Sequence, residues 1–217
     1  MYQLSNLSIC VWKAYYQQHP TSNLAMKIVL GSTSPYRRDL LLRLGLDFTT
    51  ASPNIDETQK PGEKPESLVV RLAELKATAV AKFHPEALII GSDQVASIHG
   101  EILGKPGSHE QAVKQLTRAA GRRITFYTGL CLLNSLTGDK QLCCEPFHVH
   151  FRPLSQSSIE HYLRREQPYN CAGSFKSEGL GISLFRRMEG DDPNALIGLP
   201  LIRLVDMLLN EGIDVLN

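Results

Sequence analysis

The pattern of hydrophobic and polar positions predicts strands and helices that alternate at first and β-hairpins that dominate the middle of the chain. Short apolar runs at 27–30 and 87–91 are typical of buried strands. Longer runs at 124–134 and 141–151 predict two strands joined by a polar connection, and 95–103 predicts a hairpin. This order favours an α/β fold with a mixed twisted sheet flanked by helices. A cleft between a strand–helix lobe and a hairpin–helix lobe is then the natural place for a site.

Apolar residues spaced three or four positions apart, next to capping residues, predict the helices. Leu68, Leu72, Leu75 and Ala79 form one such stripe, and Lys76 is expected on another face of the same helix. The other helices are expected to begin at or just after Ser34, Ser108, Ser155 and Pro200. The glycines expected to follow helix ends are Gly45, Gly121 and Gly212.

The segment that joins the first strand to the first helix predicts an anion-binding site. Ser34 is the expected N-cap and Pro35 the expected first helical residue. Arg37 and Arg38 then lie in the first turn of the helix. Free backbone N–H groups, the positive end of the helix dipole and two guanidinium groups therefore converge on one spot. Phosphate is the anion that suits them best.

Composition excludes several classes of function. A net charge of +1 over 217 residues gives no general field to hold nucleic acid or a membrane surface, and no apolar run is long enough to span a bilayer. The five cysteines lack C-x-x-C spacing, which indicates free thiols in a reducing cytosol. The sequence contains neither G-x-S-x-G nor a P-loop motif, which argues against a serine hydrolase and a P-loop NTPase.

Regular patterning starts at Met26. Residues 1–25 have neither the basic nor the apolar region of a signal peptide. We expect residues 26–217 to form the domain, with Met26 as the natural start and residues 1–25 as a loose arm or upstream segment. An ordered N-terminal helix is the alternative.

Two acidic positions follow strand-like runs and are candidates for catalysis or metal binding. Asp93 comes directly after the 87–91 run in a Gly-Ser-Asp turn, where a carboxylate opens into the crevice of an α/β sheet. It can take a proton from water or ligate a metal, or it can simply stabilise the turn. Asp56-Glu57 is a second acidic pair, or else a solvated loop. Magnesium prefers one or two carboxylates together with phosphate oxygens.

Two lysines and one loop complete the candidates. Lys105 lies between Gly104 and Pro106, which restrict the backbone around it, whereas Lys76 on its helix can equally extend over the core. The segment 171–179 combines small residues with Lys176 and Glu178 and allows a ligand to approach the backbone closely, although a flexible loop is the simpler reading.

Several of these motifs, in this order, resemble the Maf family of nucleotide pyrophosphatases. The resemblance runs from Met26 to the C-terminus and rests on Ser32-Thr33-Ser34-Pro35-x-Arg37-Arg38, Asp56-Glu57, Lys76-Ala77, Gly91-Ser92-Asp93, Gly104-Lys105-Pro106, Phe126-x-Thr128-Gly129 and Gly198-Leu199-Pro200. It implies a cytoplasmic hydrolase that cuts a nucleoside triphosphate between its α and β phosphates. It also implies a divalent cation, Mg or Mn, a fold similar to that of inosine triphosphate pyrophosphatases, and a homodimer.

The resemblance also implies roles for individual residues. Asp93 falls on the general base of the family, and its active-site polar positions fall on Ser32, Arg37, Arg38, Glu57, Lys76 and Lys105. Glu57 and Asp93 would hold the metal, Arg37, Arg38 and Lys105 would hold the triphosphate, and Lys76 would assist the leaving pyrophosphate. Whether Asp93 is base, ligand or both stays open.

The subgroup can be predicted from two motifs. Gln94 after Asp93, and Glu178 after Lys176-Ser177, are similar to the YceF-type branch associated with 7-methyl-GTP, not to the UTP and dTTP branch. A carboxylate at Glu178 can accept the two donors of a guanine edge, and Tyr36 can stack on a cationic methylated purine. We expect Tyr36, Gln94, Lys176 and Glu178 to bind the substrate. The alternatives are a UTP or dTTP pyrophosphatase, and a non-catalytic nucleotide-binding regulator linked to septum formation.

Overall fold

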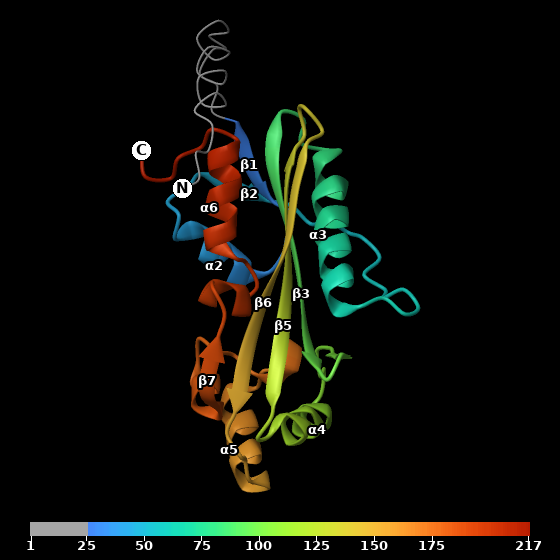
Figure 1. Ribbon diagram of the computed structural model, residues 1–217, viewed down its shortest axis with the longest axis vertical. Coiled ribbons are helices and arrows are strands. Elements are labelled where there is room, and N and C mark those ends of the chain that lie inside the picture. The colour runs from blue at the N-terminus through green and yellow to red at the C-terminus, as the bar shows by residue number, and fades with distance from the viewer. Residues whose placement is uncertain (1–25) are drawn as a thin grey trace, which may run out of the picture.

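The computed structural model describes residues 26–217, so the expectations for residues 1–25 lie outside it (Figure 1). A seven-stranded sheet has the order β2-β1-β3-β5-β6-β7, with β4 paired to β3. β1 is parallel to β2 and β3, and the other strand pairs are antiparallel. The mixed sheet, with helices on both faces, confirms the predicted fold class.

The bounds of most elements agree with the expected runs. The strands are β1 (Lys27–Leu30), β2 (Phe48–Thr50), β3 (Ala87–Ile98), β4 (Glu101–Leu103), β5 (Arg123–Asn134), β6 (Lys140–Phe151) and β7 (Phe185–Glu189). The helices are α2 (Pro35–Leu42), α3 (Pro65–Ala81), α4 (His109–Ala119), α5 (Gln156–Glu166) and α6 (Leu201–Asn210), with short 3-10 turns at Ala172–Ser174, Leu180–Leu184 and Pro193–Leu196.

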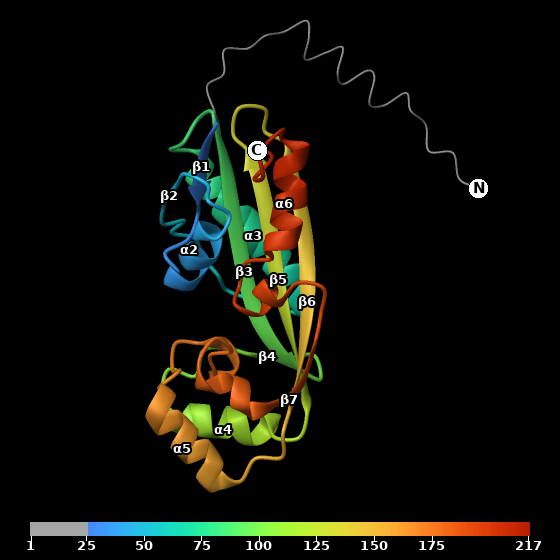
Figure 2. The ribbon, with the colours of Figure 1, turned by 90° about the vertical axis from the view of Figure 1, so that its left-hand side faces the viewer.

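Two lobes are built on the same three long strands. Figure 2 shows β3, β5 and β6 running the length of the molecule with a twist. β1, β2, α2, α3 and α6 surround one end of these strands, and β4, α4, α5 and β7 surround the other (Figures 1 and 2). The expected strand–helix and hairpin–helix lobes are therefore both present.

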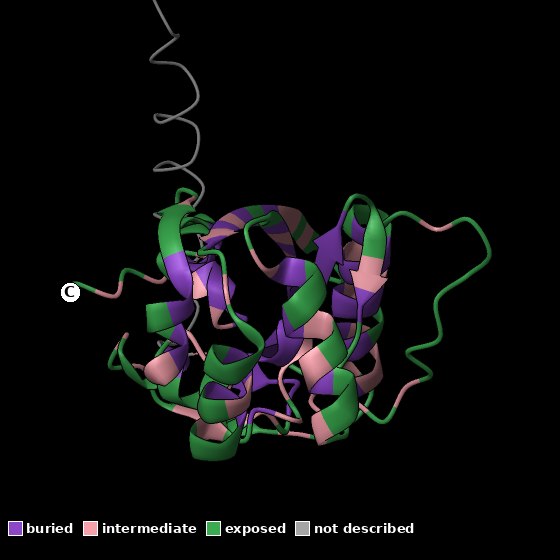
Figure 3. Ribbon diagram, turned by 90° about the horizontal axis from the view of Figure 1, so that it is seen from below, coloured by how far each residue is buried: buried purple, intermediate pink, exposed green. Residues whose placement is uncertain are grey.

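Alternation along β3 divides the core of the first lobe into two layers. Ile89 packs with α3 on one face of the sheet, and Leu88 and Ile90 pack with α2 and α6 on the other. A separate cluster around Phe126 and Leu163 fills the second lobe. Seen end-on in Figure 3, buried residues gather between the helices and the sheet.

Two glycines allow α3 to lie directly on the sheet. A Cβ at Gly91 would come 2.1 Å from the carbonyl oxygen of Ala73, and one at Gly129 would come 2.1 Å from that of Val69. Real Cβ atoms do not approach so closely, so no side chain fits between helix and strand at either point. This contact fixes the distance between α3 and the sheet, and so the position of the side chains that α3 directs toward the sheet.

Three details differ from the sequence-based expectations. β3 continues to Ile98, paired with β5 throughout, so Asp93 lies inside a strand and not in a turn. Leu68 and Leu72 of the predicted stripe are buried, but because α3 turns Ala73 and Ala77 toward the sheet, Leu75 is 40% exposed and Lys76 is buried. No apolar run predicted β7, because only its first residue, Phe185, is buried, and the strand is formed by its pairing with β6 across a bulge.

Candidate active site

A cavity of about 520 Å³ opens where the exposed edge of β3 changes partner. β1 pairs with Ala87–Ile90 and β4 with Ala96–Ile98, and between these two ladders 91–95 has no strand beside it on this edge within the described part of the chain. The cavity is lined from both lobes, by Arg37 and Glu57 from one lobe and by Lys105 and Glu178 from the other. The predicted cleft between the lobes is thus confirmed.

The turn from β1 into α2 supplies one wall. Ser34 is the N-cap, as predicted, and its Oγ accepts the Arg37 N–H at 3.5 Å. The buried hydroxyl of Ser32 accepts the Ser34 N–H at 3.1 Å and lies 3.5 Å from Nη1 of Arg37. The helix N-terminus, the serines and one guanidinium group therefore face the same space.

The loop before α6 orients Arg37. Its Nε donates to the carbonyl oxygen of Gly198 at 2.8 Å, and the Ser92 hydroxyl donates to the same oxygen at 2.8 Å. Gly198 has a φ of +122°, and a Cβ there would lie 3.3 Å from Nε of Arg37. Burial lowers the pKa of Arg37, while Asp93 and Glu57 act in the opposite direction.

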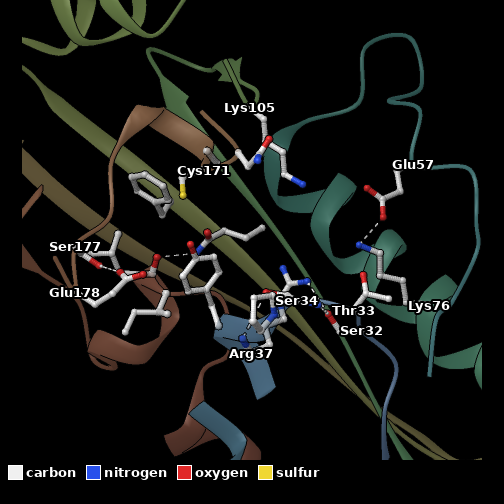
Figure 4. A pocket seen from close by; sticks show the side chains of 18 of the residues that line it. Ser32, Thr33, Ser34, Arg37, Glu57, Lys76, Lys105, Cys171, Ser177 and Glu178 are labelled. Carbon is white, nitrogen blue, oxygen red and sulfur yellow. Dashed lines mark hydrogen bonds and ion pairs between the residues drawn. The ribbon is translucent and has the colours of Figure 1, made fainter. Parts of the chain in front are cut away.

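Lys76 joins the two predicted carboxylates. Its Nζ lies 2.6 Å from Oδ1 of Asp93 and 2.8 Å from Oε1 of Glu57. Lys76 is 5% exposed and Asp93 7%, whereas the Glu57 side chain is 57% exposed. Asp93 therefore does not itself line the cavity but contacts Lys76, which does, and Figure 4 shows the more exposed Glu57 facing Lys76.

Electrostatics at Glu57 reflect the cations around it. Partial burial acts to raise the pKa of Glu57, but the hydrogen bond from Lys76 and the charges of Lys76, Lys105 and Arg37 outweigh it, and the net pKa lies below the ordinary value. Glu57 is thus a carboxylate among three cationic side chains.

A network behind Glu57 holds its loop. Arg71 of α3 binds both carboxylate oxygens of Glu63, at 2.6 and 2.7 Å, and donates to the Thr58 carbonyl oxygen at 3.1 Å. The hydrogen bond from Arg71 lowers the pKa of Glu63 to about 2. The sequence assigned no role to Arg71, because the helical pattern around a polar residue does not show which loop its side chain contacts.

The opposite wall of the cavity is aromatic and acidic. Figure 4 shows Glu178 and Ser177 across the cavity from Glu57 and Lys76. Tyr36 and Cys171 line the same wall. Burial raises the pKa of Tyr36, and the neighbouring Cys171 and Glu178 add to the rise. Cys171 begins the 171–179 segment named from the sequence, although no role was assigned to its side chain, and Asn170, which also lines the cavity, was not predicted because it forms no pattern with its neighbours.

Gln94 lies in the cavity wall with its amide nitrogen already engaged. Nε2 of Gln94 donates to the carbonyl oxygens of Ala195 and Leu196 at 2.6 and 3.1 Å, and to Oγ1 of Thr128 at 3.1 Å. Gln94 therefore ties the floor of the cavity to the 193–196 turn.

Two predicted side chains neither line the cavity nor pair with a side chain that does. Arg38 is exposed on the outer side of α2, where its Nη1 lies 3.8 Å from Oδ1 of Asp39 and its side chain borders a shallow hollow with Phe48. Lys176 turns back toward Glu166 of α5. The other nine predicted residues line the cavity or, like Asp93, contact a residue that does.

The residues present fit a divalent cation shared with phosphate. Glu57 and Asp93 already hold one cationic group between them, the ammonium of Lys76. Within residues 26–217 no group of three or more His, Cys, Asp or Glu side chains is arranged to hold a metal ion. Since Mg²⁺ usually takes only one or two carboxylates and completes its shell with waters and phosphates, two carboxylates suffice.

No helix in 26–217 has the length and apolarity that a membrane crossing needs.

Comparisons with known proteins point to one family. The family model described as Maf-like protein matches residues 27–211. The chain is 61% identical over 188 residues to a 7-methyl-GTP pyrophosphatase of Pseudomonas syringae pv. tomato, covering 87% of this chain and 98% of that protein. It is 58% identical to a protein of the same name from Nitrosococcus oceani, covering 87% and 95%.

Among solved structures, the Staphylococcus aureus Ham1 protein aligns over 86% of this chain and all of that chain, at 15% identity and a TM-score of 0.49. The family model and the relatives span nearly all of the residues that build the cavity. The chain belongs to the Maf-like protein family.

Proposed function

We propose that this chain hydrolyses 7-methyl-GTP to 7-methyl-GMP and pyrophosphate. The observation that carries the proposal is one cavity with Arg37, Lys76 and Lys105 on one side and Tyr36 and Glu178 on the other. Such a cavity suits a ligand with an anionic tail and a cationic purine. The relatives that bear the name 7-methyl-GTP pyrophosphatase support the choice of nucleotide.

The triphosphate binds to the cationic side. Arg37 offers the guanidinium nitrogens that Gly198 does not occupy, and Ser32 with the first N–H groups of α2 completes the anion site. Lys105 approaches from the other lobe. Arg38 has no part in this proposal, because it lies outside the cavity.

The base binds to the opposite side. Glu178 accepts hydrogen bonds from N1–H and the exocyclic amine of guanine, the two donors of that edge. The ring of Tyr36 stacks on the methylated purine, whose positive charge strengthens contact with an aromatic face. Gln94 shapes the floor beneath the nucleotide.

Asp93 acts as the general base for the attacking water. The water oxygen forms a bond to the α-phosphorus, its proton passes to the Asp93 carboxylate, and the bond from the α-phosphorus to the bridging oxygen breaks. Lys76 orients Asp93 through the 2.6 Å contact, and Lys76 and Lys105 stabilise the charge of the departing pyrophosphate. Glu57 and Asp93 would hold a Mg or Mn ion, which when bound supplies positive charge to the phosphoryl oxygens.

The test is turnover of a panel of nucleotides. The protein is incubated with 7-methyl-GTP, GTP, UTP and dTTP in Mg or Mn, and monophosphate and pyrophosphate are quantified. We expect 7-methyl-GTP to give the highest kcat/KM. Asp93→Asn should reduce kcat by at least about a hundredfold while 7-methyl-GTP still binds. Preference for UTP or dTTP would overturn the substrate, and binding without any product would overturn the enzyme.

We also propose that the protein works as a homodimer, the state that the family resemblance implies. Light scattering on the purified protein tests it, and a monomer at working concentration would refute it.

A further inference from the structure

Glu178 is placed by a turn and not by a helix or strand. The N–H of Gly179 donates to the Lys176 carbonyl oxygen at 3.3 Å, which closes a tight turn with Ser177 and Glu178 at its tip. Ser177 Oγ lies 3.2 Å from Oε2 of Glu178, a contact within the turn itself. The position of the Glu178 carboxylate therefore depends on what holds the two ends of this turn.

Helix α5 holds both ends. The N–H of Lys176 donates to the Tyr162 hydroxyl oxygen at 3.1 Å, and the N–H of Leu180 donates to Oε2 of Glu166 at 2.9 Å. Tyr162 and Glu166 are four positions apart and so share one face of the helix. The turn is thus fastened before and after Glu178 to a single rigid element.

The side chain of Lys176 completes this attachment. Its Nζ lies 3.6 Å from Oε1 of Glu166 and 3.4 Å from the Glu166 carbonyl oxygen, and Lys176 does not line the cavity. Glu166 is the last residue of α5, where a negative charge is unfavourable because the helix dipole is negative at that end. Lys176 therefore offsets a charge that the helix alone would disfavour.

Two glycines show how closely the turn and the carboxylate fit. A Cβ at Gly179 would lie 2.9 Å from Oε1 of Glu166, and a Cβ at Gly181 would lie 2.2 Å from the Lys176 carbonyl oxygen. The Glu166 carboxylate is packed against the turn, with its side chain 19% exposed, and is not a solvated surface group.

We propose that Glu166 and Lys176 are positioning residues that fix Glu178 against the guanine edge and so set the purine preference of the cavity. The inference rests on the proposed function. It gives Lys176 a different role from the substrate contact expected from the sequence, since its ammonium acts through the turn and touches no phosphate.

The experiment separates the two halves of the substrate. KM and kcat for 7-methyl-GTP, and the Ki of inorganic pyrophosphate, are measured for the wild type, Glu166→Ala and Lys176→Met. Glu101→Ala is the matched control, because Glu101 pairs with Arg118 in the same lobe at 2.6 Å and does not line the cavity. Hydrogen exchange at the Leu180 amide reports the turn directly.

We expect Glu166→Ala to raise KM for 7-methyl-GTP about tenfold, the effect of weakening one charge-assisted hydrogen bond, with kcat and the pyrophosphate Ki changed less than about twofold. Lys176→Met should act in the same direction but less, and Leu180 exchange should be faster in both. Glu166→Gln, which keeps an acceptor for the Leu180 N–H, should recover part of the loss. Glu101→Ala should match the wild type.

A rise in the pyrophosphate Ki of Lys176→Met would overturn the inference, because it would mean that Lys176 contacts phosphate. Unchanged KM and unchanged Leu180 exchange in Glu166→Ala would overturn it as well. If Glu166→Ala does not fold, Glu166→Gln and Lys176→Met carry the same test. Failure of the proposed function would be seen separately, as a wild type that releases no pyrophosphate from 7-methyl-GTP. In that case Glu166 and Lys176 would have no role in selecting a purine, even if the Leu180 amide were protected from exchange.

Discussion

At the scale of single residues, Lys76 links two carboxylates, Glu57 and Asp93, on the cationic side of the cavity. A buried ammonium is costly unless it is paired, and Lys76 meets two carboxylates within 2.8 Å. Asp93 is buried to nearly the same degree and depends on Lys76 in turn. Glu57 is more exposed and contributes less to stability. The pair Lys76–Asp93 therefore serves folding as well as the proposed chemistry.

Removing the Lys76 ammonium should destabilise the folded protein. We expect Lys76→Met to lower the free energy of unfolding by about 3 kcal/mol, because it leaves the Asp93 carboxylate buried without its partner. Lys140→Met is the control, since Lys140 pairs with Glu74 at 2.8 Å at the surface and should cost less than about 1 kcal/mol. Urea denaturation measures both. Equal losses in the two variants would contradict the role of burial.

At the scale of elements, α3 carries most of the site. Its inner face brings Lys76 to the sheet, and its Arg71 anchors the 56–63 loop that bears Glu57. Both functions require the helix to lie at one depth, which Gly91 and Gly129 permit. A helix displaced outward would separate Lys76 from Asp93.

We expect Gly129→Ala to lower the free energy of unfolding by about 3 kcal/mol, because the new methyl group would meet helix backbone, which cannot turn aside. Gly104→Ala, with no atom within 4 Å of the added Cβ, should change stability by less than about 0.5 kcal/mol. Thermal unfolding compares the two, and kcat of the folded Gly129→Ala fraction shows whether Lys76 still reaches Asp93.

The anchor of the 56–63 loop should depend on pH in a defined direction. Arg71 lowers the folded-state pKa of Glu63 to about 2, whereas the unfolded value is about 4.3. The stabilisation is therefore complete above the unfolded pKa and is lost as pH falls through the folded one. Glu63→Gln should lower the urea midpoint at pH 7. The difference in urea midpoint between this variant and the wild type should become smaller between pH 5 and pH 3. A gap that does not change with pH would refute the assignment.

Elements with a local signal could be predicted from the sequence, and those set by distant contacts could not. Ser34 and Pro35, two consecutive residues, define the start of α2. By contrast, Asp93 reads as a turn residue because the ladder that extends β3 belongs to β5, more than thirty residues away. Arg37 and Arg38 read alike in sequence, and only the packing of α2 against the Gly198 loop distinguishes them.

At the scale of the whole molecule, the cavity belongs to neither lobe alone. Arg37 and Glu57 come from one lobe and Lys105 and Glu178 from the other. The lobes share β3, β5 and β6, each 12 residues long, which run through both (Figure 2). Unfolding one lobe would therefore remove half of every long strand from the other.

This continuity predicts a single cooperative unfolding transition that a nucleotide shifts as a whole. With 7-methyl-GMP at a hundred times its Kd, the free energy of unfolding should rise by about 2.7 kcal/mol, because the ligand binds only the folded chain. Calorimetry should give one endotherm whose calorimetric and van't Hoff enthalpies agree, with and without the ligand. Glu178→Gln should reduce this ligand-induced increase in the free energy of unfolding, because it weakens the contact with the guanine base. Two separate endotherms, only one of which moves with 7-methyl-GMP, would show that the lobes unfold independently and that the nucleotide is held by one of them.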